Sequence, residues 1–261
     1  MLAEERQDLI LLWVNEHKTV STESLLKRLN VSKMTLWRDL KSLEERNKIR
    51  RVYGGAMAVD DGSRPEPAFD SKRVINHEQK NAIARYAARN FIADGDILIL
   101  EGGTTIVEMV QYIERSDITI LSHGLNTLMA ASKRMPDITV IGCGGILREA
   151  SMTFVGPDAE AFFHNSKADT AFMSGEGITV EDGITDINPL ENQVKRAMVK
   201  SADRVIGMMD SSKIGKRSLS EVATRAELSA VITDDAAPPE FRREAERWGI
   251  ELHIVEVSKA E

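Results

Sequence analysis

Residues 20–56 read VSTESLLKRLNVSKMTLWRDLKSLEERNKIRRVYGGA, and this stretch decides the architecture of the N-terminal part of the chain. The first amphipathic segment starts at Ser21, a residue type that caps helix N-termini, and its apolar face consists of Leu25, Leu26 and Leu29. Asn30 tolerates the left-handed conformation that ends a helix, and Ser32 is suited to cap the next one. The stretch therefore predicts two helices joined by a tight turn.

The second of these helices is predicted to run from Ser32 to about Asn47, with a core face of Met34, Leu36, Leu40 and Leu43. Residues 49–55 then alternate apolar and basic side chains and end in Gly54-Gly55, which permits a turn. Residues 3–17 add an earlier helix with one apolar stripe. Three helices followed by a basic strand are typical of a winged helix-turn-helix, which places one helix in the DNA major groove.

The residues expected to contact DNA lie on this recognition helix and on the wing. Recognition helices read bases through their first turns, so the candidates there are Ser32, Lys33, Thr35 and Trp37. The candidates for phosphate or groove contacts are Arg38, Lys41, Arg50 and Arg51. Alternatives stay open: Lys41 and Arg38 are also spaced for ion pairs with Glu45 and Asp39, and Trp37 is also suited to pack under the wing.

Charge and composition agree with a small DNA-binding end on a larger acidic body. The chain has 261 residues and a net charge of −7; residues 1–58 carry 11 Lys/Arg and 8 Asp/Glu, or +3, and the remainder carries 23 and 33, or −10. No apolar run approaches the ~20 residues that span a bilayer. The acidic N-terminus does not resemble a secretory signal, and a single cysteine, Cys143, fits a reducing compartment. We therefore expect a cytoplasmic protein with no membrane partner.

The region after residue 58 divides into a linker and a second domain. Residues 59–76 are polar and carry two prolines without a helical or strand period, which predicts a linker, with Phe69 docked on a core. From residue 77 to 261, short apolar strands alternate with helical patterns. The predicted fold class is therefore α/β: a winged helix-turn-helix over 1–58 and a larger, doubly wound, mainly parallel sheet domain over 77–261.

Polar loops follow several of the predicted strands, where ligands bind in parallel sheets. The first reads Glu101-Gly102-Gly103-Thr104-Thr105 and opens a helix, so its amides and hydroxyls suit a phosphate. A second loop ends in Lys213, which supplies a positive charge. Further loops contain His123, Gly175 and Glu176. The alternatives are a plain strand-to-helix turn, a solvated lysine and an ordinary loop histidine.

Two sets of motifs carry a resemblance to a known family. The run Val31-Ser32-Lys33-Met34-Thr35-Leu36-Trp37-Arg38-Asp39-Leu40-Lys41-Ser42-Leu43-Glu44, followed by Gly54-Gly55-Ala56, resembles the signature of DeoR-type transcriptional regulators. The sequence departs from it at Trp37, where the family commonly has an arginine. Later matches are Glu101–Thr105, Gly183-Ile184-Thr185 and Asp210-Ser211-Ser212-Lys213.

The resemblance implies that the second domain is similar to ribose-5-phosphate isomerase and binds an effector. It implies that Gly103, Thr104, Thr105 and Lys213 hold the phosphate of a sugar phosphate. Glu101 stands where the family has an aspartate, and His123 lies in a second departure; both are expected to face the ligand.

The sequence leaves three functions to compare. We expect a repressor of a carbohydrate operon, with operator DNA, a phosphorylated sugar and further copies of itself (a homodimer or homotetramer) as partners, and with no cofactor or metal. The alternative is a sugar-phosphate isomerase with a DNA-binding end. The resemblance places the isomerase Glu-Lys pair near Val194-Lys195, which offers no glutamate, although Glu191 is nearby. The third is a DNA-binding scaffold without an effector.

Overall fold

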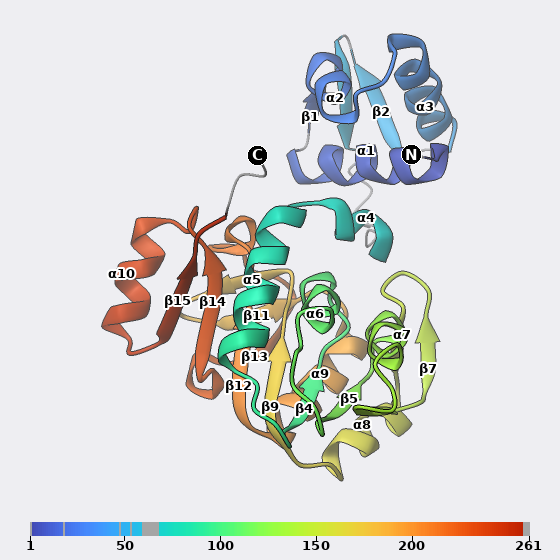
Figure 1. The fold of residues 1–261 in the computed structure, drawn as a ribbon. Coiled ribbons are helices and arrows are strands. Elements are labelled where there is room, and N and C mark those ends of the chain that lie inside the picture. The colour runs from blue at the N-terminus through green and yellow to red at the C-terminus, as the bar shows by residue number, and fades with distance from the viewer. Residues whose placement is uncertain (1, 18, 47, 53, 59–67, 258–261) are drawn as a thin grey trace. The chain divides into compact units, whose positions relative to one another are not determined.

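The computed structural model describes residues 2–17, 19–46, 48–52, 54–58 and 68–257. The predicted helix end at Asn47, Tyr53 of the wing and residues 59–67 of the predicted linker lie outside the described residues. The chain divides into two compact units, residues 1–75 and 76–261, each with its own hydrophobic core (Figure 1).

The N-terminal unit is a winged helix-turn-helix, as predicted. Its elements are α1 (Ala3–His17), β1 (Thr19–Ser21), α2 (Thr22–Leu29), α3 (Lys33–Glu45), β2 (Ile49–Val52), β3 (Gly55–Ala58) and α4 (Phe69–Val74). The three strands form an antiparallel sheet in the order β1-β3-β2, in which Val20 pairs with Ala56. This pairing with the wing explains why residues 19–21 form a strand that was not predicted.

Local chemistry sets the helix-turn-helix boundaries as expected. The Ser21 hydroxyl accepts a hydrogen bond from the Ser24 amide, and the Ser32 hydroxyl accepts one from the Thr35 amide, both at 3.1 Å. Asn30 has a φ of 50°, in the left-handed region. The two caps and the turn between them therefore follow directly from these residue types.

Two expectations for this unit were wrong. Met34 is 59% exposed, because it lies about 200° around α3 from Leu36, whereas Leu36, Leu40 and Leu43 recur every three to four residues and are buried. The second half of the predicted linker forms helix α4, which lies against helix α1 of the same unit and whose Phe69 is buried. Six residues make fewer than two helical turns, which is too short to show a 3.6-residue repeat.

A buried ion pair fastens the recognition helix to α1. Both carboxylate oxygens of Asp39 accept hydrogen bonds from the Arg6 guanidinium, with Nε–Oδ2 at 2.5 Å and Nη2–Oδ1 at 3.1 Å. Gln7 donates a further bond to Oδ1. Asp39 thus pairs with Arg6 of another helix. The alternative prediction, an ion pair between Asp39 and the adjacent Arg38, is wrong.

The C-terminal unit is built on a seven-stranded parallel sheet in the order β15-β14-β12-β9-β4-β5-β6 (Figure 1). In chain order the strands are β4 (Ile97–Leu100), β5 (Thr119–Ser122), β6 (Thr139–Gly142), β9 (Ala168–Met173), β12 (Ala202–Met208), β14 (Ala230–Asp234) and β15 (Glu251–Val255). This confirms the predicted parallel sheet.

Helices cover both faces of this sheet, so the unit is doubly wound as predicted. They are α5 (His77–Asn90), α6 (Thr104–Val110), α7 (Leu125–Ser132), α8 (Pro157–His164), α9 (Pro189–Ser201) and α10 (Pro239–Arg247). Strand residues alternate between two cores: Leu98 and Leu100 pack with α5, α6 and α7, while Ile99 packs with α8 and α9.

Smaller strands escaped prediction because each contains at most two consecutive apolar residues, whereas β4, for example, reads ILIL. They form a hairpin of β7 (Ile146–Arg148) and β8 (Thr153–Val155), and a sheet of β10 (Gly177–Thr179), β11 (Gly183–Asp186) and β13 (Ser220–Ala223). Two 3₁₀ turns, η1 (Ser211–Lys213) and η2 (Arg225–Glu227), complete the unit. No described helix is both long and apolar enough to cross a lipid bilayer.

The strand order reverses between β4 and β9. From β4 the chain proceeds through β5 to β6 in one direction, and β9, β12, β14 and β15 extend the sheet in the other. In open parallel sheets, ligands bind at the carboxyl ends of the strands that flank such a reversal. The loops after β4 and β9, which begin at Glu101 and Ser174, lie at this point.

We predict that Asp39→Ala lowers the free energy of unfolding of the N-terminal unit by about 2–3 kcal/mol, because it leaves the Arg6 guanidinium buried without its carboxylate. Urea unfolding followed by tryptophan fluorescence in a Trp248→Phe background reports this, since Trp13 and Trp37 both lie in that unit. Glu45→Ala is the control: its pair with Lys41 is exposed, so its effect stays below about 0.5 kcal/mol. Equal effects of the two variants would contradict the structural role of Asp39.

Candidate functional site

The outer face of the recognition helix α3 presents the side chains that were predicted to contact DNA. Lys33, Trp37, Arg38 and Lys41 are exposed, and Thr35 is half-buried. The hydroxyls of Ser32 and Thr35 lie 2.9 Å apart. Lys41 also lies 3.7 Å from Glu45, the exposed ion pair expected as its alternative role.

Trp37 occupies the middle of this face and does not belong to the core. Its ring is 46% exposed, and it lies below two cations: Lys41 Nζ is 5.4 Å and Arg51 Cζ 5.5 Å from its centroid. The Arg51 amide donates to the Glu44 carboxylate at 3.1 Å, which fixes the wing strand against α3. Arg50 is exposed on the same strand. Trp37 thus connects the recognition helix to the wing.

Met34 was missed as a member of this face. It lies one helical turn before Trp37 and is exposed. Met34 lies three residues before Trp37, and this spacing predicts that the two side chains share one face of the helix. The prediction that Met34 belongs to the core did not take this spacing into account.

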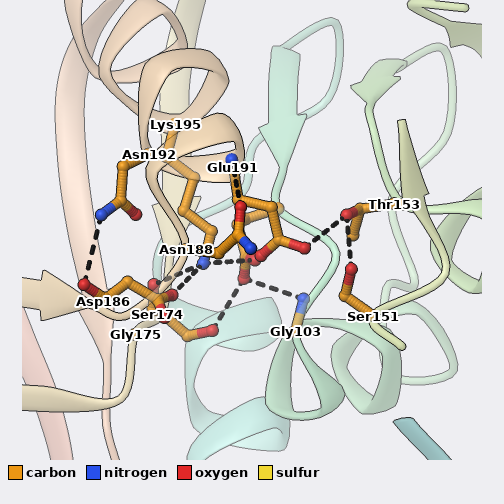
Figure 2. Close-up of polar contacts among 12 residues, drawn as sticks. Gly103, Ser151, Thr153, Ser174, Gly175, Asp186, Asn188, Glu191, Asn192 and Lys195 are labelled. Atoms are coloured by element: carbon orange, nitrogen blue, oxygen red, sulfur yellow. Dashed lines mark hydrogen bonds and ion pairs between the residues drawn. The ribbon is translucent and has the colours of Figure 1, made fainter. Parts of the chain in front are cut away.

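In the C-terminal unit, the loops after three strands meet in one chain of polar contacts, of which Figure 2 labels Gly103, Ser174 and Gly175. Lys213 Nζ, after β12, donates to the Gly175 carbonyl at 2.5 Å. The neighbouring Ser174 hydroxyl donates to Glu101 Oε2 at 2.7 Å, and the Gly103 amide donates to the same oxygen at 2.8 Å. The structure thereby brings together predicted site residues that lie far apart in the sequence.

Lys195 of α9 lies at the centre of these contacts, although it was not among the residues predicted to bind the effector. Its Nζ atom is 2.6 Å from Asp186 Oδ2 and 3.0 Å from Glu101 Oε1, and the side chain is 3% exposed. Burial opposes the charged ammonium, but the nearby carboxylates of Asp186, Glu101 and Glu191 raise the pKa of Lys195 well above its ordinary value. Lys195 is therefore a permanent buried cation.

The carboxylate of Glu101 is ionised for the same reason. Burial by itself raises the pKa of Glu101, but the Lys195 charge and the Ser174 hydrogen bond bring it below the ordinary value. Glu101 thus faces inward, and its carboxylate occupies the Gly103 amide that was expected to bind phosphate. Thr104 and Thr105 are buried at the start of α6.

Glu191 forms a second part of the network with the β7–β8 hairpin (Figure 2). Its Oε1 atom accepts a 2.8 Å hydrogen bond from Thr153 Oγ1. The same oxygen forms an ion pair with Arg148 Nη1. Burial opposes its charge, but Lys195 and the hydroxyls of Ser151 and Thr153 lower the pKa of Glu191 to about 2. A carboxylate with this pKa is a weak base at neutral pH.

His123 lies fully buried beside this network. Neither ring nitrogen has a hydrogen-bond partner among the described residues, and burial lowers the pKa of His123 to about 4. The ring is therefore neutral near pH 7, with one donor and one acceptor unused. Buried polar groups in folded proteins usually have a hydrogen-bond partner, so the unsatisfied ring of His123 requires an explanation.

The structure thus adds Arg148, Thr153, Asp186, Glu191 and Lys195 to the predicted residues. One signal was present in the sequence: Glu191 and Lys195 are four residues apart, on one face of a helix. Arg148, Thr153 and Asp186 gave no such signal, because their short strands meet α9 only in the folded chain.

Comparison with known families agrees with this division into a DNA-binding unit and a ligand-binding unit. A model of the DeoR-like helix-turn-helix domain matches residues 6–61, and a model of the DeoR C-terminal sensor domain matches residues 75–235. The chain belongs to the DeoR family of transcriptional regulators. Its N-terminal unit is the family's DNA-binding domain, and its C-terminal unit is the sensor domain.

Similarity to individual DeoR-family regulators extends over almost the whole chain. It is 35% identical over 250 residues to the HTH-type transcriptional regulator GlpR of Haloferax volcanii, covering 96% of this chain and 97% of the relative. It is 32% identical to the uncharacterized regulator YulB of Bacillus subtilis, covering 99% of both, and 31% identical to the repressor GlcR of the same species, covering 98% of both.

Similarity to solved structures is more distant. Ribose 5-phosphate isomerase from Plasmodium falciparum aligns with a TM-score of 0.38 and 15% identity over 52% of each chain. A probable sor operon regulator from Shigella flexneri aligns with a TM-score of 0.38 and 10% identity, covering 70% of this chain and 85% of that one. At these scores the likeness carries no argument about function.

We predict that the stabilising effect of Glu191 depends on pH. Its folded pKa of about 2 lies below the unfolded value of 4.5, so the effect is fully present above pH 5 and is lost as the pH falls toward 2. The shift corresponds to about 3 kcal/mol, of which about 2 kcal/mol disappears between pH 6 and pH 3. The difference in unfolding free energy between wild type and Glu191→Gln, measured by urea titration at both pH values, should shrink by this amount.

Glu149→Gln, which changes an exposed carboxylate in the loop of the same hairpin, is the matched control. Its difference from wild type should stay the same at pH 6 and pH 3. A pH-independent difference for Glu191→Gln would contradict the depressed pKa of this group.

Proposed function

We propose that this DeoR-family protein represses a carbohydrate-metabolism operon and that a phosphorylated sugar, bound by the C-terminal unit, controls its affinity for DNA. The observation that carries the proposal is the contact chain from Lys213 through Gly175 and Ser174 to Glu101. It joins the ends of β12, β9 and β4 beside the reversal of strand order, where parallel sheets bind ligands.

In this proposal the phosphate lies against the loop after β4. The backbone of Gly102 and Gly103 permits close approach, and Thr104 and Thr105 supply amides and hydroxyls at the start of α6. Lys213 supplies the positive charge after releasing the Gly175 carbonyl. Because Glu101 now occupies the Gly103 amide, phosphate binding requires that this carboxylate moves or that the phosphate uses the later amides.

The sugar hydroxyls are proposed to meet the residues around the buried cation. His123 offers an unused donor and an unused acceptor, which suits hydroxyl groups better than a second charge. Glu101 and Glu176 are proposed to accept hydrogen bonds from other hydroxyls of the sugar. Among the described groups, the unsatisfied ring of His123 is the chief support for this orientation.

On the DNA side, the proposed base-reading residues are Ser32, Lys33, Thr35 and Trp37, and the proposed phosphate contacts are Arg38, Lys41, Arg50 and Arg51. Trp37 supports this division, because its ring holds Lys41 and Arg51 at the junction of recognition helix and wing. Helix-turn-helix proteins usually read paired half-sites, so we propose that the protein acts as a homodimer or homotetramer. A sugar phosphate that binds one arrangement of the copies more tightly than another shifts the population toward that arrangement. The affinity for DNA then changes by at most the difference between the two binding free energies of the sugar phosphate.

We further propose that the sensor unit has no isomerase activity. Proton transfer between adjacent carbons needs a base of suitable pKa within reach of the substrate. Lys195 is a buried cation, and Glu191 has a pKa of about 2 and is held by Arg148 and Thr153. Neither group suits the role of a general base at neutral pH.

We predict that Lys213→Ala weakens binding of the effector about 10- to 100-fold, because it removes a charge-assisted contact to phosphate, while DNA binding stays at the wild-type level. A thermal-shift screen of phosphorylated sugars against the wild type identifies the ligand, and the same titration is then repeated with the variant. Lys200→Ala, an exposed lysine near the end of α9, is the control of equal charge.

If the ligand stabilises the Lys213→Ala protein at the same concentrations at which it stabilises the wild type, Lys213 does not belong to the ligand site. If none of the phosphorylated sugars stabilises the wild type, the effector class is wrong. Turnover of a pentose phosphate by the purified protein above background would contradict the absence of isomerase activity.

We predict that Arg38→Ala weakens operator binding about 10-fold and reduces the slope of log affinity against log salt concentration by about 1, because one phosphate contact is lost. Fluorescence anisotropy measures both, with a duplex that the wild type selects from a random pool. Arg243→Ala, on the exposed face of α10 in the sensor unit, is the control and leaves affinity and slope unchanged. An unchanged salt slope for Arg38→Ala would exclude the phosphate contact.

A further inference from the structure

Two large apolar side chains are exposed on the recognition helix α3. Met34 is 59% exposed and Trp37 is 46% exposed, and neither is part of the core that the described residues of the N-terminal unit form. They are three residues apart, so they are neighbours on one face of the helix. Both lie in its first two turns, the part of a recognition helix that meets the base edges. We call Met34 and Trp37 the apolar pair.

The polar groups at the start of α3 are already engaged with one another. The Ser32 hydroxyl accepts a hydrogen bond from the Thr35 amide, and it also lies 2.9 Å from the Thr35 hydroxyl. Lys33 is exposed there, but its ammonium is a point charge that attracts phosphates as well as base acceptors. A large part of base recognition therefore falls to the apolar pair.

Basic side chains surround the apolar pair. Lys33, Arg38 and Lys41 are exposed on α3, and residues 33–38 include no acidic side chain. Arg51 of the wing lies over the Trp37 ring, with its Cζ atom 5.5 Å from the centroid. An apolar centre with cations around it fits the major groove of DNA, where phosphates flank the base edges on both sides.

We infer that the apolar pair reads thymine through the C5-methyl group of this base. In the major groove thymine presents this methyl group, whereas the other three bases present hydrogen-bond donors and acceptors. The flexible thioether of Met34 adapts to such a group, and Trp37 offers a rigid apolar surface. The inference rests on the proposed base-reading role of the recognition helix, for which it names the base and the group that is recognised.

The test removes the methyl group from DNA and changes nothing else. Deoxyuridine pairs as thymidine does but lacks the C5-methyl group, so it replaces each thymine in turn in a duplex that the wild type selects from a random pool. We expect at least one replacement in each half-site to weaken wild-type binding about 4-fold, the effect of one buried methyl group. Fluorescence anisotropy measures the affinities, and replacement of thymines outside the selected site is the DNA control.

Protein variants assign the methyl contact to the apolar pair. Met34→Ala and Trp37→Ala should each lose the difference between thymine and uracil at one or more of these positions. Met34→Leu keeps an apolar side chain of similar volume and should retain the wild-type difference. Met129→Ala, at a methionine of the sensor unit that is also 59% exposed, is the matched control and should retain it as well.

Circular dichroism establishes that the variants are folded, which the exposure of both side chains favours. A selected half-site without thymine, or a wild-type affinity that no uracil replacement changes, would overturn the inference. The same holds if folded Met34→Ala or Trp37→Ala retains the full difference between thymine and uracil. An equal loss of affinity for both duplexes in Trp37→Ala would show that the ring only positions Lys41 and Arg51.

The outcome separates from that of the proposed function. A wild type that selects a duplex and responds to a sugar phosphate retains that function even when uracil replacement has no effect. Conversely, the titrations contain no sugar phosphate, so loss of the difference in the variants supports thymine recognition even when no sugar phosphate binds.

Discussion

The sensor unit depends on one buried cation, the ammonium of Lys195. It joins the end of β4 through Glu101, the end of β9 through the Ser174 carbonyl and the end of β11 through Asp186, all from helix α9. A buried ammonium is costly to desolvate, so its carboxylate partners are required for it to remain charged. These partners lie on separate elements, so their contacts with Lys195 fix the ends of β4, β9 and β11 relative to one another. The loops around the proposed ligand site begin at these strand ends and are positioned by the same contacts.

The same interaction supports the proposal that the site binds a ligand and does not catalyse a reaction. Lys195 lowers the pKa of Glu101 and Glu191, and burial lowers that of His123, so each of these three groups is held in one protonation state near pH 7. General acid–base catalysis requires groups that exchange protons near the working pH. In the proposed function, fixed charges and the neutral, unsatisfied imidazole of His123 instead recognise the ligand.

The N-terminal unit uses a smaller version of the same arrangement. Asp39 lies on the buried face of the recognition helix α3 and forms an ion pair with Arg6 of α1. Trp37 lies on the exposed face of α3, and the cations of Lys41 and Arg51 lie over its ring. One ion pair therefore fixes the rotation of α3 in its own unit, and that rotation decides which side chains face DNA. In the sensor unit, the β7–β8 hairpin supplies Arg148 and Thr153, which both contact the carboxylate of Glu191.

The sequence by itself determined the helix-turn-helix and the parallel sheet. Ser21, Asn30 and Ser32 act through bonds to their immediate neighbours, and the strands of the sheet are short apolar runs, so residue type and spacing suffice to predict them. Only the tertiary structure decided that residues 69–74 form a helix and that Lys195 lies among Glu101, Asp186 and Glu191. These outcomes depend on contacts between segments far apart in the chain, and the free energy of a buried charge is set by the partners that folding brings to it.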